Sequence, residues 1–164
     1  RAVIDGTAGL MATWDKLSEA LDAMTNAIVA EDGVIGDFQG DAVMGFWGWP
    51  VAQDDQIQRA ARAALEIRRE FVKFQANPRH PLAATKCGVG LAHGPAIAGK
   101  LGTFEQMKIG VFGPVVNRAS RLEAATKAVG VPILVDEEVY RGLTAAPDHD
   151  GGRLRRVCNV TPQG

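Results

Sequence analysis

The chain has 164 residues, with 18 lysines and arginines against 19 aspartates and glutamates, a formal net charge of -1 and a pI near 6.3. This balance excludes a generic polyanion-binding domain, because nucleic-acid-binding domains usually carry a basic face and a high pI. The content of 46% hydrophobic and 23% charged residues excludes disorder and predicts one globular domain. Cys87 and Cys158 lie far apart without a CxxC spacing, so neither a disulfide scaffold nor a zinc site is indicated, and a reducing compartment is favoured.

The sequence contains no visible targeting segment. No apolar run approaches the roughly 18 residues that span a bilayer, and no secretory signal peptide is visible in these 164 residues. Because the chain begins at Arg1 rather than at methionine, we expect it to be part of a longer protein. We expect that protein to be cytoplasmic, or this chain to be the cytosolic domain of a larger membrane-attached protein.

The first third of the chain predicts a long helix followed by a β-hairpin. Apolar residues at helical spacing predict a helix over 10–30, which Asp32-Gly33 ends because glycine suits a left-handed cap. Two apolar runs within 34–47 flank a polar, glycine-containing centre and predict a hairpin with its tip near Gln39-Gly40. Pro50 is expected to end the second strand, since proline cannot donate to a strand ladder.

The remaining elements alternate irregularly between helices and strands. They are a helix over 54–75, a loop over 77–81, two strands over 86–98 joined near His93-Gly94, a strand over 104–112, a helix over 114–128 stopped by Gly130, a strand over 131–135, a helix over 136–143 and a last strand over 154–160. Because hairpins interrupt the strand–helix alternation, we expect an α+β fold with helices packed on a mixed, mostly antiparallel sheet. A doubly wound parallel fold is disfavoured.

Glycines over 88–94 have only a superficial likeness to a phosphate-binding loop. The segment reads G-x-G-x-x-x-G, one residue longer than the dinucleotide fingerprint, and a strand rather than a helix is expected after it. We therefore interpret these glycines as sites of close strand packing and a tight turn. His93 has no second histidine or cysteine at metal-ligand spacing, and Cys87 is interpreted as a small core residue.

Two carboxylates lie near the expected hairpin tip. Asp37 and Asp41 flank Gly40 inside an otherwise apolar hairpin. Turn chemistry alone explains an aspartate there, because aspartate tolerates left-handed backbone geometry. The alternative interpretation is a site for a divalent cation, which carboxylate oxygens are suited to hold.

The helix expected over 114–128 carries a second polar pair. Asn117 and Arg121 are four residues apart and therefore share one helical face. An amide beside a guanidinium can orient a hydroxyl group and stabilise a phosphoryl transition state. A solvent-exposed helix with an Arg–Glu pattern is the alternative interpretation of the same residues.

Together, the hairpin and this helix resemble the class III nucleotidyl cyclases, the adenylate and guanylate cyclases. The resemblance rests on four segments in the family's order and spacing: 40–48 (GDAVMGFWG), 90–94 (GLAHG), 113–123 (GPVVNRASRLE) and 131–135 (VPILV). It implies a ferredoxin-like α/β sandwich of the class III cyclase type. It also implies that 1–164 forms a single catalytic domain without its first strand.

The resemblance further implies a reaction and a set of site residues. In this family the 3′-hydroxyl of a nucleoside triphosphate attacks its own α-phosphorus, and two ions of Mg²⁺ or Mn²⁺ activate the hydroxyl and bind the phosphates. Asp41 matches the second metal-binding aspartate, Asn117 the asparagine that positions the ribose, and Arg121 the arginine that stabilises the transition state. Because the family divides these roles between two subunits, a head-to-tail homodimer with active sites at its interface is implied.

The sequence departs from the family at several positions. The first metal-binding aspartate belongs to a D-x-x-G-F strand that we expect before Arg1. Asp37 stands where the family has a purine-selecting lysine, and the second purine-selecting position falls at Gly110. No lysine in 159–164 matches the family's phosphate-binding lysine. The expected substrate contacts are Asp37, Phe38, Gly40 and Gly110.

We therefore predict a nucleotidyl cyclase domain that makes cyclic AMP from ATP, with an upstream regulatory domain and no nucleic-acid partner. Guanylate cyclase activity stays open, because Asp37 and Gly110 do not specify adenine. The alternative is a catalytically inactive cyclase-homology module for dimerisation or regulation, which the absence of an upstream D-x-x-G-F strand would favour. A diguanylate-cyclase-like domain is disfavoured, since 39–42 (QGDA) does not match that family's G-G-D/E-E-F turn.

Overall fold

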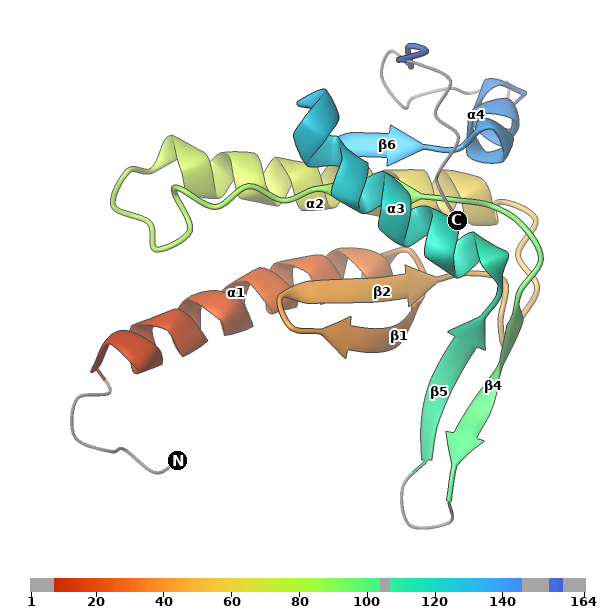
Figure 1. Ribbon diagram of the computed structural model, residues 1–164, viewed down its shortest axis with the longest axis horizontal. Helices are drawn as coiled ribbons and strands as arrows, with labels where there is room; N and C mark the ends of the chain where they lie inside the picture. Colours follow the sequence, from red (N-terminus) through yellow and green to blue (C-terminus); the bar gives the residue numbers. More distant parts are fainter. Residues whose placement is uncertain (1–7, 104–106, 146–153, 158–164) are drawn as a thin grey trace.

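The computed structural model describes residues 8–103, 107–145 and 154–157. Within these residues the chain forms four helices and six strands, arranged as Figure 1 shows. In chain order they are α1 (Ala8–Ala30), β1 (Val34–Gln39), β2 (Ala42–Phe46), α2 (Gln56–Ala76), β3 (Val89–Leu91), β4 (Ile97–Gly102), β5 (Met107–Phe112), α3 (Pro114–Val129), β6 (Ile133–Val135) and α4 (Glu137–Thr144).

The first helix confirms the prediction over 10–30, but it ends differently from what the sequence indicated. Asp32, and not Gly33, adopts the left-handed conformation, with a φ of 55°. Gly33 is required for space instead, because a Cβ on it would lie 2.7 Å from side-chain atoms of both Ile28 and Trp47. The end of α1 therefore packs directly against the residue that follows β2.

The β1–β2 hairpin forms as predicted. The two strands pair antiparallel up to Gly40 and Asp41, which form the turn, and Gly40 has the positive φ (64°) that such a turn requires. The second strand ends at Phe46 rather than at Pro50. Phe46 pairs with Val34, the first residue of β1, so the partner strand has no residue left to extend the ladder.

The core lies between α1 and α2. Its buried residues come from both helices and from the loop after α2: Ala20, Ala27, Ile28, Ile67, Phe71 and Leu82. Ion pairs fasten the start of α2 to the end of α1. Arg62 Nε lies 2.8 Å from a Glu31 carboxylate oxygen, and Arg59 pairs with both Asp32 and Asp55. The helix predicted over 54–75 is confirmed as α2 (Gln56–Ala76), which begins two residues later and ends one residue later than predicted.

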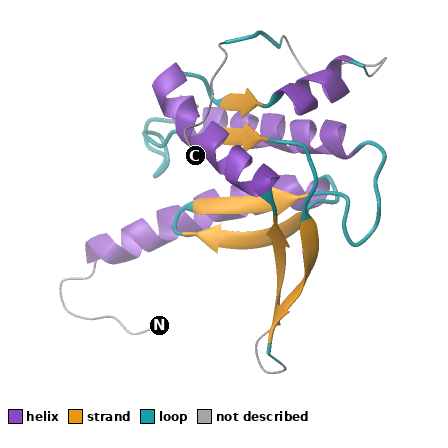
Figure 2. Cartoon of the chain, turned by 45° about the vertical axis from the view of Figure 1, so that its right-hand side comes forward, coloured by secondary structure: helices purple, strands orange, loops and turns teal. Residues whose placement is uncertain are grey.

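The six strands form three two-stranded ladders rather than one continuous sheet. β1 pairs with β2 and β4 with β5, both antiparallel, whereas β3 pairs with β6 in parallel. The two strands expected over 86–98 exist, but they belong to different ladders and do not form a hairpin at His93-Gly94. The expected α+β class with mostly antiparallel pairing is confirmed. Figure 2 shows the β4–β5 hairpin projecting away from the helices.

Helix α3 lies against β3 at very short range. A Cβ on Gly90 would come within 2.2 Å of the Ala119 carbonyl oxygen and 2.4 Å of the Glu123 nitrogen, so only glycine fits there. Pro114 occupies the first turn of α3, and Gly130 ends the helix in the left-handed conformation (φ 73°), as the sequence predicted.

The C-terminal part of the chain follows the prediction less closely. β6 and α4 confirm the strand over 131–135 and the helix over 136–143. Residues 154–157 are not part of a strand, so the strand predicted over 154–160 is wrong for these residues, and its remainder lies outside the described residues. The strand predicted over 104–112 is β5, whose first expected residues, 104–106, are also outside the description. None of the described helices has the length and apolar character needed to cross a bilayer.

Candidate active site

The β1–β2 turn presents an exposed carboxylate. The positive φ of Gly40 lets the chain reverse within two residues, and Asp41 beside it is exposed. Within the described residues, Asp41 has no hydrogen-bond or ion-pair partner. Phe38, 52% exposed, lies on β1 just before the turn. The turn can therefore offer an anionic oxygen and an aromatic surface to a ligand.

Asp37 connects this hairpin to β5. Its Oδ2 accepts a hydrogen bond from Lys108 Nζ at 3.2 Å, and its Oδ1 accepts one from the backbone N–H of Phe38 at 3.0 Å. Gly110, two residues after Lys108, is buried and offers no side chain. The polar group beside Asp37 is thus Lys108, which the sequence analysis missed. The two-residue period of β5, which puts Lys108 and Gly110 on one face, is the signal that could have found it.

Helix α3 presents the second polar pair. Asn117 and Arg121 lie one turn apart on its exposed side, and neither side chain has a hydrogen bond or ion pair with another described residue. Both belong to the first half of the helix, whose N-terminal end carries a partial positive charge that favours anionic ligands. This arrangement is suited to a phosphate group.

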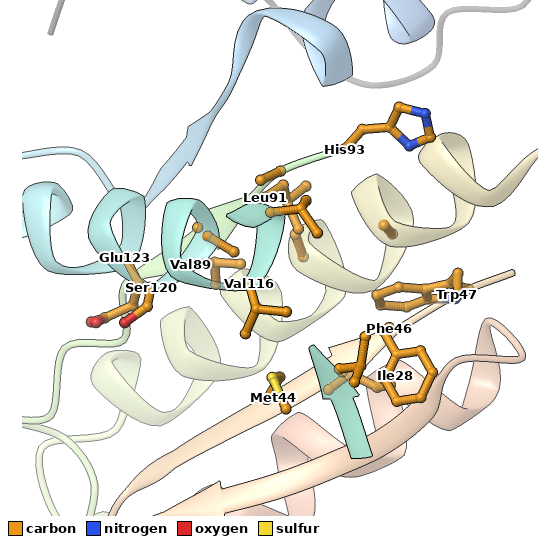
Figure 3. Close-up of a pocket in the computed structure, with 18 of the residues that line it drawn as sticks. Ile28, Met44, Phe46, Trp47, Val89, Leu91, His93, Val116, Ser120 and Glu123 are labelled. Atoms are coloured by element: carbon orange, nitrogen blue, oxygen red, sulfur yellow. The ribbon is translucent and has the colours of Figure 1, made fainter. Parts of the chain in front are cut away.

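A cavity of about 700 Å³ lies between β2 and β3 (Figure 3). Its walls are mainly apolar: Met44 and Phe46 of β2, with Ile28 of α1 behind them, face Val89 and Leu91 of β3. Within the described part of the chain, β2 pairs only with β1 and β3 only with β6. The cavity therefore separates two strand edges whose backbone groups lack ladder partners.

One end of the cavity is polar. Ser120 and Glu123 of α3 point into it, as Figure 3 shows, and Cys87 lies in the same wall. Burial raises the pKa of the Cys87 thiol from 9.0 to about 11, and the nearby charges of Glu123 and Asp41 act in the same direction. Cys87 is therefore a neutral thiol at physiological pH, which agrees with its interpretation as a small, largely buried residue packed against the core.

The predicted site residues fall into two groups. One group lies on the hairpin and on β5: Asp37, Phe38, Gly40, Asp41 and Gly110. The other group, Asn117 and Arg121, lies on α3. In Figure 1 the β1–β2 turn is at the opposite end of its ladder from the junction of β5 and α3. No hydrogen bond or ion pair between described residues joins the two groups.

The described residues do not by themselves form a metal site. No three histidine, cysteine, aspartate or glutamate side chains within them lie close enough to hold an ion. Asp41 supplies one carboxylate, and cations such as Mg²⁺ need several oxygen ligands. The histidine, cysteine, aspartate and glutamate side chains of the described residues therefore cannot by themselves complete the coordination of an ion at Asp41.

Comparisons with known proteins agree on one family. The profile of the family described as "Adenylate and Guanylate cyclase catalytic domain" matches residues 11–156. Adenylate cyclase 1 of Rhizobium meliloti (strain 1021) is 33% identical over 124 residues, which are 75% of this chain and 19% of that protein. The chain thus spans about a fifth of the length of this relative.

Solved structures have the same fold. A bacterial light-regulated adenylyl cyclase superimposes with a TM-score of 0.72 at 26% identity, over 81% of this chain and 39% of that one. The guanylate cyclase domain of RhGC from Catenaria anguillulae, solved in complex with GTP, has a TM-score of 0.62 at 26% identity, over 85% of this chain and 72% of that one. With the profile matching 11–156 and these folds in agreement, the chain belongs to the family of adenylate and guanylate cyclase catalytic domains.

Proposed function

We propose that this chain is the catalytic domain of a nucleotidyl cyclase that converts ATP to cyclic AMP and pyrophosphate in signal transduction. The family match over 11–156 and the likeness to an adenylate cyclase support this activity. The observation that carries the proposal is the pair on α3: Asn117 and Arg121 are exposed, one turn apart and unpaired with any other described residue.

In the proposed reaction the ribose 3′-oxygen forms a bond to the α-phosphorus while the bond from that phosphorus to the bridging β-phosphate oxygen breaks. The hydroxyl proton passes to solvent, and pyrophosphate leaves. Asn117 orients the ribose through its side-chain amide. Arg121 neutralises the charge that grows on the α-phosphoryl oxygens in the transition state, where a preorganised guanidinium has the largest effect.

We place the purine base beside β1 and β5. The Asp37 carboxylate, held by Lys108, can accept a hydrogen bond from an amino group of the base. The exposed aromatic ring of Phe38, the next residue of β1, lies on the opposite face of the strand and is proposed to contact the nucleotide at the edge of the site. Gly40 and the buried Gly110 contribute shape rather than polar groups. ATP is proposed as the substrate because the similar protein from Rhizobium meliloti is an adenylate cyclase, and GTP is the competing substrate to measure.

We propose Mg²⁺ or Mn²⁺ as the cofactor, in two ions per site, with Asp41 as one ligand. When bound, such ions supply positive charge to the phosphates. The exposed Asp41 carboxylate suits a hard cation, but it cannot hold one alone. We propose that a second metal-binding carboxylate comes from the aspartate of the D-x-x-G-F motif, on the first strand of the domain.

The cavity between β2 and β3 is the proposed position of that strand. β2 and β6 run in the same direction in Figure 1, and β3 is parallel to β6, so β2 and β3 also run in the same direction. One strand antiparallel to both would satisfy the free edges on both sides and fill the apolar cavity. We propose that the chain over 1–164 is a single catalytic domain to which this strand belongs.

We propose a head-to-tail homodimer that builds two shared sites. The projecting β4–β5 hairpin carries an exposed apolar face, with Ile97 (79% exposed) beside its strand partner Phe112 and with Leu101 farther along. Apolar surfaces of this kind are typical of protein interfaces. Because no hydrogen bond or ion pair between described residues joins Asp41 to the α3 pair, we propose that a second copy completes each site. An upstream regulatory domain and a cytoplasmic or membrane-attached cytosolic location belong to the same proposal.

Mixing two inactive variants of the full-length protein tests this proposal. Arg121→Ala removes a donor that acts in the transition state, so kcat is expected to fall by about two to three decades, roughly 3–4 kcal/mol, with little change in KM. Arg121→Lys should restore little of the lost kcat, because lysine lacks the planar guanidinium group that can bind two phosphoryl oxygens at once. Asp41→Asn disables the complementary half of the site. The mixture should regain one working site per heterodimer.

The outcomes are distinguishable. Heterodimers that form but stay as inactive as their parents would overturn the shared site. A wild-type protein that dimerises but has no turnover of ATP or GTP with Mn²⁺ would instead support the dimerisation or regulatory module.

A further inference from the structure

A nearly buried carboxylate at the end of β6 joins three other segments of the chain. The Asp136 side chain is only 8% exposed. Its Oδ2 accepts hydrogen bonds from Arg118 Nη1 at 2.9 Å and from the backbone N–H of His93 at 3.2 Å. Its Oδ1 accepts one from the backbone N–H of Val139 at 2.9 Å, which caps α4. Asp136 thus links β6 to the β3–β4 loop, to α3 and to α4.

The position of this carboxylate is fixed. The backbone N–H of Asp136 donates to the Leu91 carbonyl oxygen at 3.0 Å, where β3 ends beside β6. Both side-chain oxygens accept hydrogen bonds, so the carboxylate has little freedom to rotate. A buried carboxylate also requires a countercharge, because an unpaired charge away from water is costly. Arg118 supplies that countercharge.

Arg118 is placed where it can determine the orientation of α3. It directly follows Asn117 and stands three residues before Arg121, so one turn of helix contains all three. Among the described residues, the contact of this turn with β3 is steric, because the Ala119 carbonyl oxygen packs against Gly90. Steric contacts set the distance between helix and strand, but they are not directional. The charge-assisted hydrogen bond from Arg118 to Asp136 is directional and fixes rotation about the helix axis.

We propose that Arg118 and Asp136 form a positioning pair that holds Asn117 and Arg121 in their working orientation. The pair touches no substrate and acts through α3. This inference rests on the proposed cyclase function for its kinetic consequence, whereas its structural consequence, a fixed first half of α3, stands independently of turnover.

The test uses Arg118→Met in the full-length protein. Methionine keeps an apolar stem of similar length and removes the charge. Arg118 is 40% exposed, so the variant is expected to fold. Arg118→Lys is the conservative variant, and Arg141→Met is the matched control, since Arg141 forms ion pairs with Glu137 and Glu138 on the surface of α4. Asp136→Asn removes the negative charge that pairs with Arg118 and keeps a side-chain oxygen that can accept the hydrogen bond capping α4.

Two measurements decide the proposal. Backbone amide hydrogen exchange over 117–123 is expected to become at least about fivefold faster in Arg118→Met and Asp136→Asn, to recover partly in Arg118→Lys and to stay unchanged in Arg141→Met. In steady-state assays kcat should fall at least about tenfold with KM within about twofold of wild type. The double variant Arg118→Met/Arg121→Ala should be less than about tenfold slower than Arg121→Ala alone, because the part of the effect that acts through Arg121 is already lost and only the part through Asn117 remains.

Unchanged exchange over 117–123 in Arg118→Met would overturn the proposal, whatever the activity. Faster exchange with wild-type kcat would show that the orientation of α3 does not limit turnover, and would overturn the positioning role. If the wild-type protein has no turnover, the proposed function fails, and the exchange data alone decide whether the pair fixes α3.

Discussion

Replacing Gly90 by alanine tests how strictly α3 must be placed on the sheet. The new Cβ would lie 2.2 Å from the Ala119 carbonyl oxygen and 2.4 Å from the Glu123 nitrogen, whereas ordinary van der Waals contacts begin at 3.4 Å. Both atoms belong to the helix backbone, so no side-chain rotation can relieve the clash. The helix or the strand has to move by about 1 Å.

This displacement has two expected costs. Overpacking of this kind lowers the free energy of unfolding by about 1–3 kcal/mol, which corresponds to a decrease in Tm of roughly 3–10 °C for a domain of this size. A shift of about 1 Å at groups that position a substrate can reduce the rate by about 100-fold. Because α3 carries Asn117 and Arg121, we expect kcat to fall by about that factor even in fully folded Gly90→Ala protein.

The assay combines thermal unfolding followed by circular dichroism with cyclic nucleotide formation at a temperature where all variants are folded. Gly94→Ala is the matched control, because its Cβ would meet Val115 of the same helix at an ordinary 3.7 Å. This control should leave both Tm and kcat unchanged. A Gly90→Ala protein with wild-type Tm and kcat would refute the steric argument. A lower Tm with wild-type kcat would refute the link between the position of α3 and turnover.

Three further predictions concern single positions. Asp41→Asn should lower Mn²⁺-dependent turnover by orders of magnitude at unchanged Tm, because loss of an anionic oxygen weakens a hard cation site; a Mn²⁺ titration with wild-type activity would contradict the assignment. Gly130→Ala should cost about 1–2 kcal/mol of stability in thermal unfolding, since Gly130 has a φ of 73°, and Gly130→Asn should cost less. In a Cys158→Ser background, alkylation of Cys87 should stay slow at pH 9 and approach half its maximal rate near pH 11, because the pKa of the thiol is raised from 9.0 to about 11. The stability that this neutral thiol contributes should be complete below pH 9 and lost between pH 9 and pH 11; alkylation with an apparent pKa of 9 in the native protein would disprove the burial argument.

Elements with a local signal were predictable from the sequence. The helical spacing before residue 30, the turn at Gly40, and the start and end of α3 at Pro114 and Gly130 each depend on residues a few positions apart. Strand pairing was not predictable in the same way. The glycines over 88–94 indicated a hairpin, but Gly90 is there to admit the backbone of α3, and the parallel partner of β3 is β6, more than 40 residues later.

In the candidate site, too, residues with a local signal were predictable and residues with distant partners were not. The shared exposed face of Asn117 and Arg121 follows from their spacing on a helix, which any helical prediction contains. Lys108 and Asp136 could not be assigned, because their roles depend on partners 71 and 18 residues away, Asp37 and Arg118. The two-residue period of β5 places Lys108 on the face of Gly110, but a single sequence does not bring Lys108 or Asp136 to its distant partner.

The free edges of β2 and β3 also bear on how the protein behaves in solution. An unpaired edge next to apolar side chains is a template on which strands of other molecules can add, which is the usual start of aggregation. Protein prepared with the space between these strands empty is therefore expected to self-associate at high concentration in a way that differs from the proposed dimer. A strand bound in the cavity between β2 and β3 would pair with both edges. The same cavity would therefore affect both the stability of the fold and the solubility of the protein.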